Sequence, residues 1–210
     1  MRIPGGRSAR RGTKNVPKRI TIIQGNPDPA GEHFGRALAQ AYTRGAEAAG
    51  HEVKLIEVAG LDFPLLRSKS QWEQGTTTPD AIRGAQEAIA WADHLLIVYP
   101  LWLGAMPAVL KGFFEQALRP GFALGEPRAN KMPTKLLKGR SARIVITMGM
   151  PGFVYRWYFG AHSLKNLRRN ILRFCGIGPV RTTLIGMVEG SARRRDKWLA
   201  KMQRLGTQGR

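Results

Sequence analysis

Five short apolar segments alternate with segments of helical periodicity along this chain, and this alternation restricts the fold more than any other feature. The first and third segments are apolar runs that break at Gly25 and Pro100, which is typical of buried strands, whereas residues 52–58 alternate between polar and apolar side chains. Strands are predicted at residues 18–24, 52–58, 93–100, 142–148 and 180–188. Helices are predicted at residues 31–49, 79–91, 107–118, 162–174 and 192–205.

This order of elements predicts one α/β domain built as a three-layer sandwich. A five-stranded parallel sheet of order 2-1-3-4-5 is expected between two layers of helices. The chain has 210 residues, which suits one such domain with short tails. We expect a disordered basic tail at residues 1–17, the domain at 18–205 and a short C-terminal tail at 206–210. Residues 59–78 lack periodicity and are predicted to form a long loop, as are residues 119–140.

The charge of the chain is strongly positive, with 34 Lys and Arg residues against 14 Asp and Glu and a formal net charge of +20. Much of the excess lies in the acid-free segment 1–19 and in the last predicted helix, at 193–204. A solvated basic surface is the simpler interpretation, and contact with a polyanion is the alternative. Nucleic acid is not expected as a partner, because exposed aromatic residues are not interleaved with the charge. The basic tail remains a candidate contact for polyanions.

Cysteine content and hydropathy bear on the location of the protein. Cys175 is the single cysteine, so no intrachain disulfide forms, as in proteins of the reducing cytosol. The first residues lack the apolar core of a secretory signal, and no stretch approaches 18 apolar residues. A cytoplasmic protein without a membrane span is therefore expected.

Several classes of site lack their sequence motifs. Neither G-x-x-x-x-G-K-[ST] nor G-x-G-x-x-G occurs, so the sequence does not support a phosphate-binding-loop NTPase or a Rossmann dinucleotide site. The nucleophile motif G-x-S-x-G of hydrolases is also missing. The four histidines and Cys175 do not have the spacing of metal ligands, and no metal site is predicted.

Three segments rich in Gly, Pro or aromatic residues follow the first, third and fourth strands, at 25–34, 100–106 and 147–155. Ligands of such sheets bind at the carboxyl ends of the strands. The first segment enters a helix whose free amides favour a phosphate, with an ordinary turn as the alternative. The second segment is suited to line one side of a flat heteroaromatic ring, and a turn that packs in the core is the alternative. The glycines of the third allow close backbone approach.

Tyr155 and His162 follow the fourth predicted strand, seven residues apart. A phenol and an imidazole can donate protons or hydrogen bonds to a substrate that is being reduced. The alternative is structural, with Tyr155 packed against aromatic neighbours and His162 at a helix end.

The run YPLWLGAMPAVLKGFFEQ, residues 99–116, resembles the signature of the NAD(P)H:quinone reductase family, which includes DT-diaphorase and the modulator of drug activity B proteins. Shorter blocks that support the resemblance lie at residues 120–123, 135–139, 160–162 and 171–176. The similarity extends over residues 18–205, nearly the whole predicted domain.

The resemblance implies a flavodoxin-like fold and an NAD(P)H dehydrogenase (quinone)-type flavoenzyme. Such an enzyme transfers a hydride from NAD(P)H through bound FMN or FAD to a quinone or similar acceptor. A homodimer with sites at the interface is also implied. By this resemblance Tyr155 and His162 are catalytic, and the cofactor-binding residues are Asn26, Gly31, His33, Phe34, Pro100, Leu101, Trp102, Leu103, Gly104, Thr147, Met148, Gly149 and Met150.

The first loop departs from the family pattern. In the family this loop often ends in a hydroxyl residue followed by Phe-Asn, whereas this chain has His33-Phe34-Gly35. The phosphate contacts and the choice between FMN and FAD therefore stay open at this stage. The Arg193–Arg195 cluster is a candidate contact for an ADP moiety, which would favour FAD, and a solvated helix start is the alternative.

Two other functions fit the same fold. One is a non-catalytic, basic, polyanion-binding protein, and the other is a one-electron carrier of the flavodoxin type. The partners of such carriers usually require an acidic surface, so the net charge of +20 argues against the carrier.

Overall fold

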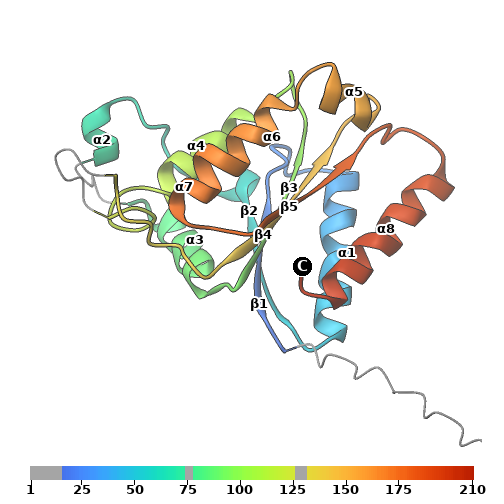
Figure 1. Ribbon diagram of the computed structural model, residues 1–210, viewed down its shortest axis with the longest axis horizontal. Helices are drawn as coiled ribbons and strands as arrows, with labels where there is room; N and C mark the ends of the chain where they lie inside the picture. Colours follow the sequence, from blue (N-terminus) through green and yellow to red (C-terminus); the bar gives the residue numbers. More distant parts are fainter. Residues whose placement is uncertain (1–15, 74–77, 126–131) are drawn as a thin grey trace, which may run out of the picture.

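The computed structural model describes residues 16–73, 78–125 and 132–210. Within these ranges one parallel sheet has the order β2-β1-β3-β4-β5, and the predicted flavodoxin-like fold class is confirmed (Figure 1). The strands are β1 Arg19–Gln24, β2 Glu52–Glu57, β3 His94–Pro100, β4 Ser141–Thr147 and β5 Val180–Ile185.

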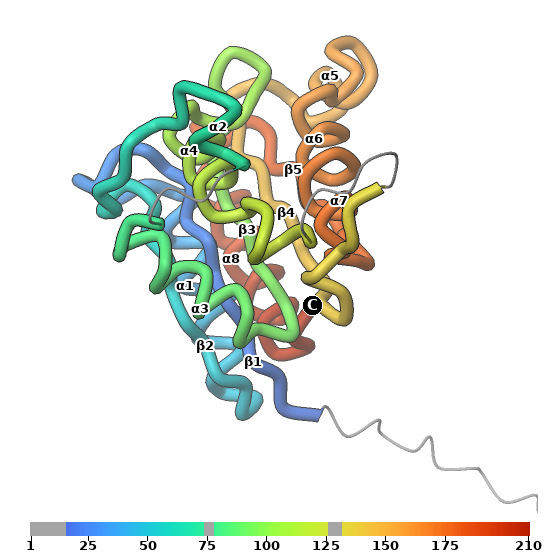
Figure 2. The backbone as a smooth tube through the Cα atoms, turned by 90° about the vertical axis from the view of Figure 1, so that its left-hand side faces the viewer, coloured from blue at the N-terminus to red at the C-terminus, as the bar shows by residue number. Residues whose placement is uncertain are grey.

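Two layers of helices enclose the sheet. Helices α1 and α8 cover one face, while α3, α4, α6 and α7 cover the other, onto which Figure 2 looks. None of the described helices is long and apolar enough to cross a membrane. The helices are α1 Phe34–Ala48, α2 Lys69–Glu73, α3 Asp80–Trp91, α4 Ala108–Ala117, α5 Gly152–Trp157, α6 His162–Asn166, α7 Arg173–Cys175 and α8 Ala192–Thr207.

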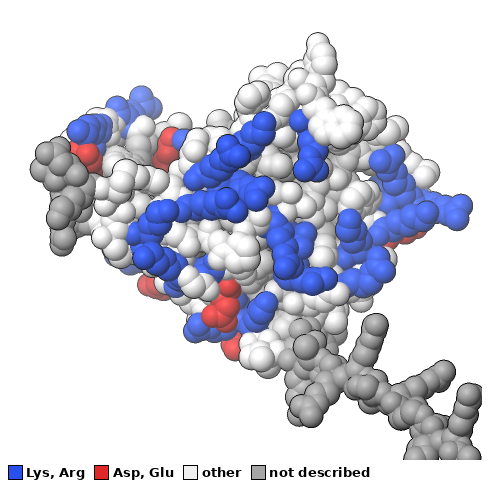
Figure 3. Space-filling view, in the orientation of Figure 1, with Lys and Arg blue, Asp and Glu red and all other residues white. Residues whose placement is uncertain are grey.

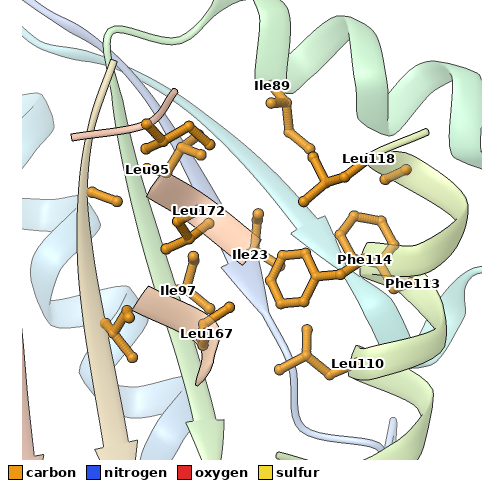
Figure 4. Close-up of a cluster of buried hydrophobic side chains, with 14 of the residues drawn as sticks. Ile23, Ile89, Leu95, Ile97, Leu110, Phe113, Phe114, Leu118, Leu167 and Leu172 are labelled. Atoms are coloured by element: carbon orange, nitrogen blue, oxygen red, sulfur yellow. The ribbon is translucent and has the colours of Figure 1, made fainter. Parts of the chain in front are cut away.

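The core explains why the inner strands have nearly continuous apolar sequences. Strands β1, β3 and β4 are buried on both faces, as expected for a parallel sheet between helices. On the face of the sheet that α3, α4, α6 and α7 cover, Ile23 and Ile97 lie beside Phe113 and Phe114 of α4 (Figure 4). Burial of side chains of this size stabilises the fold by about 1.5–3 kcal/mol each.

Two glycines set the distance between α1 and α8. A Cβ atom added to Gly206 of α8 would lie 2.0 Å from the carbonyl oxygen of Tyr42, and one added to Gly45 of α1 would lie 2.0 Å from that of Gln203. The two backbones therefore touch directly, without side chains between them. This contact fixes α8 against the domain and brings the start of α8 beside the start of α1.

Several boundaries differ from the sequence predictions. The predicted loop 59–78 contains α2, and the segment 147–155 contains most of α5, because short helices lack a readable periodicity. The predicted helix 162–174 is α6, a π-helical stretch Leu167–Leu172 and α7. Helix α8 continues into the predicted C-terminal tail, where the carbonyl oxygen of Gly209 accepts a hydrogen bond from Lys18. Most of the predicted N-terminal tail lies outside the described residues.

The glycine contact between α1 and α8 makes a stability prediction. We expect Gly206→Ala to lower the free energy of unfolding by about 2 kcal/mol or more, because the methyl group meets a backbone atom that cannot move alone. Gly84 of α3 is the matched control, since nothing lies within 4 Å of a Cβ added there. Gly84→Ala should stabilise the helix by about 0.5–1 kcal/mol. Thermal unfolding followed by circular dichroism compares the two, and equal melting temperatures would contradict this account of the interface.

Candidate active site

The loops that follow β1, β3 and β4 are tied to neighbouring strands at the carboxyl edge of the sheet. The amide of Gly25 donates to the carbonyl oxygen of Val98 (2.8 Å), and that of Leu101 donates to Thr147 (2.8 Å). The amide of Met148 donates to Ile185 (2.9 Å). Because β1 lies between β2 and β3, the chain leaves β1 and β3 in opposite directions, and this edge is the topological switch point.

The loop after β1 is organised by its own polar side chains. The carboxylate of Asp28 accepts a hydrogen bond from the amide of Ala30 (2.9 Å) and lies 2.8 Å from Nε2 of His33. The Ala30 amide and, secondarily, His33 hold the pKa of Asp28 below its usual range. The guanidinium of Arg36 donates to the carbonyl oxygen of Gly31 (3.0 Å). These contacts fix the path of the chain into α1.

The first turn of α1 has the properties of an anion site. His33 is the N-cap residue, its side chain makes no capping hydrogen bond, and the turn contains no acidic residue. The helix dipole and the amides that start the helix therefore favour a negatively charged group.

Gln24, the last residue of β1, is a polar residue that the sequence analysis missed. Its side chain is 3% exposed, and within the described part of the chain its Nε2 has no hydrogen-bond partner. An unpaired buried donor of this kind is costly, so it indicates a ligand or water. The available signal was a polar residue at the carboxyl end of an otherwise apolar strand.

The loop after β3 is a tight turn with an apolar tip. Trp102 and Ala105 exchange two backbone hydrogen bonds, of 2.9 and 2.8 Å. Between them Leu103 and Gly104 have left-handed backbone, with φ of 46° and 75°. The Leu103 side chain is fully exposed and Trp102 is about half exposed, so the turn presents apolar surface at the edge of the sheet.

Backbone strain is concentrated at this edge. Among the described residues the non-glycine positions with positive φ are Leu103, Ala161 and Met187. They belong to the loop after β3, the turn between α5 and α6, and the loop after β5. Left-handed backbone costs a side-chain-bearing residue about 1–2 kcal/mol. Such strain gathers at functional sites, so it independently points to this edge.

The loop after β4 is braced by the loop after β5, which the sequence analysis did not include. The amide of Met187 donates to Met150 (3.2 Å), and that of Val188 donates to Met148 (3.3 Å). Gly186 permits this approach, because a Cβ there would lie 2.4 Å from the amide nitrogen of Gly152. Thr147 and Met148 are buried, whereas Gly149 is exposed.

Tyr155 and His162 lie on opposite sides of a left-handed turn at Gly160 and Ala161. Tyr155 is 1% exposed, and its hydroxyl accepts a hydrogen bond from the amide of Leu164 (3.2 Å). Burial raises the pKa of this hydroxyl, so it stays protonated at neutral pH. His162 is exposed, with its ring over Gly160. The structure thus places the phenol inside the fold and the imidazole at its surface.

A groove of about 500 Å³ adjoins the start of α1 and separates it from α8. Among its lining residues are Gly31, His33 and Phe34 from the predicted set and Arg195 from the predicted Arg193–Arg195 cluster. Asn26 is buried under the same loop. The predicted residues 100–104 and 147–150 form the neighbouring loops along the same edge.

These features fit a flavin phosphate and ring. The uncapped start of α1 suits a phosphate, and Nε2 of Gln24 at the end of β1 is a hydrogen-bond donor without a partner in the described residues. The turn at Leu103 and Gly104 and the segment Thr147–Met150 offer apolar side chains and backbone amides beside it. No group of described residues has the composition of a metal site.

A parallel sheet with a ligand edge at its switch point defines a doubly wound α/β protein. Over residues 18–207 the chain matches the family described by a flavodoxin-like fold, and it belongs to that family.

Individual relatives agree with the resemblance inferred from residues 99–116. A Haemophilus influenzae protein called an uncharacterized NAD(P)H oxidoreductase is 28% identical, over 82% of this chain and 87% of that protein. The NAD(P)H dehydrogenase (quinone) 1 of Rattus norvegicus is 29% identical, over 72% of this chain and 63% of that protein. An FMN-dependent NADH:quinone oxidoreductase 1 of Bradyrhizobium diazoefficiens is 31% identical over 50% of each. The last two matches span less than two thirds of those relatives.

The solved structure of Smu.1420 from Streptococcus mutans is also similar. It has a TM-score of 0.76 and 25% identity, and the match covers 90% of this chain and 98% of that one. The similarity therefore extends over the sheet and both helical layers.

Proposed function

We propose that this protein is a flavin-dependent oxidoreductase that uses NAD(P)H to reduce a quinone or a similar acceptor. The observation that carries the proposal is the carboxyl edge of the sheet, which holds an uncapped helix start, a strained apolar turn and the unpaired, buried Nε2 of Gln24. The names of the Haemophilus, rat and Bradyrhizobium relatives support the reaction type.

FMN is the cofactor we favour, because one relative is named as FMN-dependent. When bound, a flavin supplies two-electron chemistry between a nicotinamide and a quinone. The start of α1, at Phe34 and Gly35, would hold its phosphate. Residues 100–104 and 147–150 would hold its ring. FAD remains the other outcome, with Arg195 of the α1–α8 groove available to an ADP moiety.

His162 and Tyr155 are proposed to act on the acceptor side. His162 is exposed at the edge and can donate a hydrogen bond to an oxygen that gains negative charge. Tyr155 is buried and holds the Leu164 amide of α6, so it is proposed to position His162. Direct contact of Tyr155 with substrate stays a prediction.

Substitutions of His33, the N-cap residue of α1, test whether the start of this helix binds the flavin phosphate. We expect wild-type protein to bind FMN below about 10 μM, roughly −7 kcal/mol. His33→Asp places a carboxylate at the helix start, so it should weaken FMN at least about tenfold while riboflavin, which lacks the phosphate, is unaffected. His33→Asn is the neutral control, and because its cap competes for the same amides it should weaken FMN only about two- to fivefold, the 0.5–1 kcal/mol of a cap. Both caps should stabilise the ligand-free protein by about 0.5–1 kcal/mol.

Fluorescence titration of the three proteins with FMN, FAD and riboflavin provides the measurement. Equal affinities of wild-type protein for FMN and riboflavin would refute a phosphate-binding site at the start of α1. Failure of every flavin to bind below about 10 μM would refute the proposed function.

Stopped-flow kinetics of flavin reduction and reoxidation tests the two side chains. His162→Gln and Tyr155→Phe should each retain flavin and slow the half-reactions by roughly ten- to a hundredfold, since a tenfold change is about 1.4 kcal/mol. If Tyr155 acts through His162, the double variant should be no slower than His162→Gln alone. Parent-like rates for both single variants would show that both residues are structural, whereas multiplied effects would indicate direct contact by Tyr155.

A cytoplasmic homodimer is proposed as the form in which the enzyme acts. The dimer follows from the family resemblance, and the cytoplasmic location from the single, buried, free Cys175. Light scattering in moderate salt should give twice the monomer mass of 23.3 kDa. A monomer that carries flavin at micromolar concentration would contradict the dimer.

A further inference from the structure

A groove of about 660 Å³ crosses the open edge of the sheet between α5 and α8, and none of the residues that line it belongs to the proposed flavin-binding set. Strand β5, the edge strand of the sheet, forms the floor of this groove with Thr182, Thr183 and Leu184. None of the described residues that line this groove is acidic. The side chains that give it its chemistry are Phe153, Trp157, Trp198, Arg143, Arg156 and Lys201.

A cationic stripe on α8 continues the groove. Arg194, Lys197, Lys201 and Arg204 follow one another at intervals of three or four residues and share one face of the helix. Like charges at this spacing repel one another, and a bound anion would relieve that repulsion. Figure 3 shows Lys and Arg side chains gathered on this side of the molecule, over α6, α7 and α8. The stripe thus extends the basic lining well beyond the groove itself.

Arg143 of β4 is a buried cation that faces like charges. It is 7% exposed, one guanidinium nitrogen donates to the Thr183 hydroxyl (2.9 Å), and its Nε has no hydrogen-bond partner in the described ranges. Its charged neighbours are Arg181 and Arg210. A buried charge normally has a partner of opposite sign. This side chain therefore points, independently of the stripe, to an anionic ligand in the groove.

Aromatic rings lie among these cations in the groove. Trp157 is 81% exposed and Phe153 65% exposed, both on α5. Trp198 comes from α8, and the Lys201 ammonium lies 4.6 Å from its ring centroid. Arg156 precedes Trp157 in the sequence and Lys197 precedes Trp198, but only the fold shows that these two segments line one groove and that the ring of Trp157 is exposed.

We propose that this groove binds single-stranded nucleic acid without sequence preference. Phosphates would lie along the α8 stripe and at Arg143 and Arg156, and bases would stack on the exposed rings of Trp157 and Phe153. A basic channel with aromatic platforms is the usual architecture of such sites. The proposal does not depend on the flavin chemistry.

The shape and composition of the surface favour a strand over other anions. The cations and rings line a groove, which accommodates a strand better than the flat surface of an anionic bilayer. A polyanion without bases would use the stripe but leave Trp157 and Phe153 without a role.

Fluorescence anisotropy with a labelled single-stranded DNA of about twelve nucleotides tests the proposal on the full chain at physiological salt. Wild-type protein should bind with a dissociation constant of about 10⁻⁵–10⁻⁶ M. Trp157→Ala should weaken binding at least about fivefold, the loss expected for one stacked base. Tyr158→Ala is the matched control, because Tyr158 neighbours Trp157, is 82% exposed and does not line the groove. It should change affinity less than twofold.

The contribution of ionic contacts to DNA binding is tested by the salt dependence of the affinity. Lys201→Ala should reduce the slope of log affinity against log salt by roughly 0.7, the value for one phosphate contact on a single strand. Arg67→Ala removes one exposed charge near α2, across the sheet from α8, and should leave the slope unchanged. Unaltered binding by both Trp157→Ala and Lys201→Ala would overturn the proposal. Equal affinity for inorganic polyphosphate, or binding to anionic phosphatidylglycerol vesicles without DNA binding, would do the same.

Discussion

The hydrogen-bonded pairing of β1 with β3 is the constraint on which the rest of this structure depends. Register between Ile20–Gln24 and His94–Val98 places the ends of the two strands side by side while β2 occupies the far side of β1. The loops after β1 and β3 must then diverge, which opens space at the carboxyl edge. The uncapped start of α1 and the strained turn at Leu103 follow β1 and β3 at this edge as a consequence of strand order.

Close helix packing links that edge to the basic side of the molecule. Because Gly45 and Gly206 allow α1 and α8 to touch, the start of α8 lies beside the start of α1, and Arg195 reaches the groove next to His33. The opposite face of α8 carries the Arg194–Arg204 stripe, of which Lys201 also lines the groove over β5. One helix thus lines two surfaces, a proposed cofactor groove on one side and a proposed nucleic-acid groove on the other.

The sheet and its order are predictable from the sequence because each inner strand is a compact apolar run that ends at Gly or Pro. The ligand edge follows from that order, and residues 99–116 indicate the family. What the sequence did not reveal depends on contacts between distant segments. The burial of Tyr155 against α6, the unpaired Nε2 of Gln24 and the bracing of Met150 by Met187 each need the folded backbone. Helices α2 and α5 are too short for periodicity to identify.

A crystal structure of the protein with FMN tests most directly whether the carboxyl edge of the sheet is a flavin-binding site. We expect the FMN phosphate within hydrogen-bond distance of the Phe34 and Gly35 amides and the flavin ring against residues 101–104 and 147–150. A flavin found elsewhere, such as on the α8 stripe, or a phosphate distant from the start of α1, would contradict it.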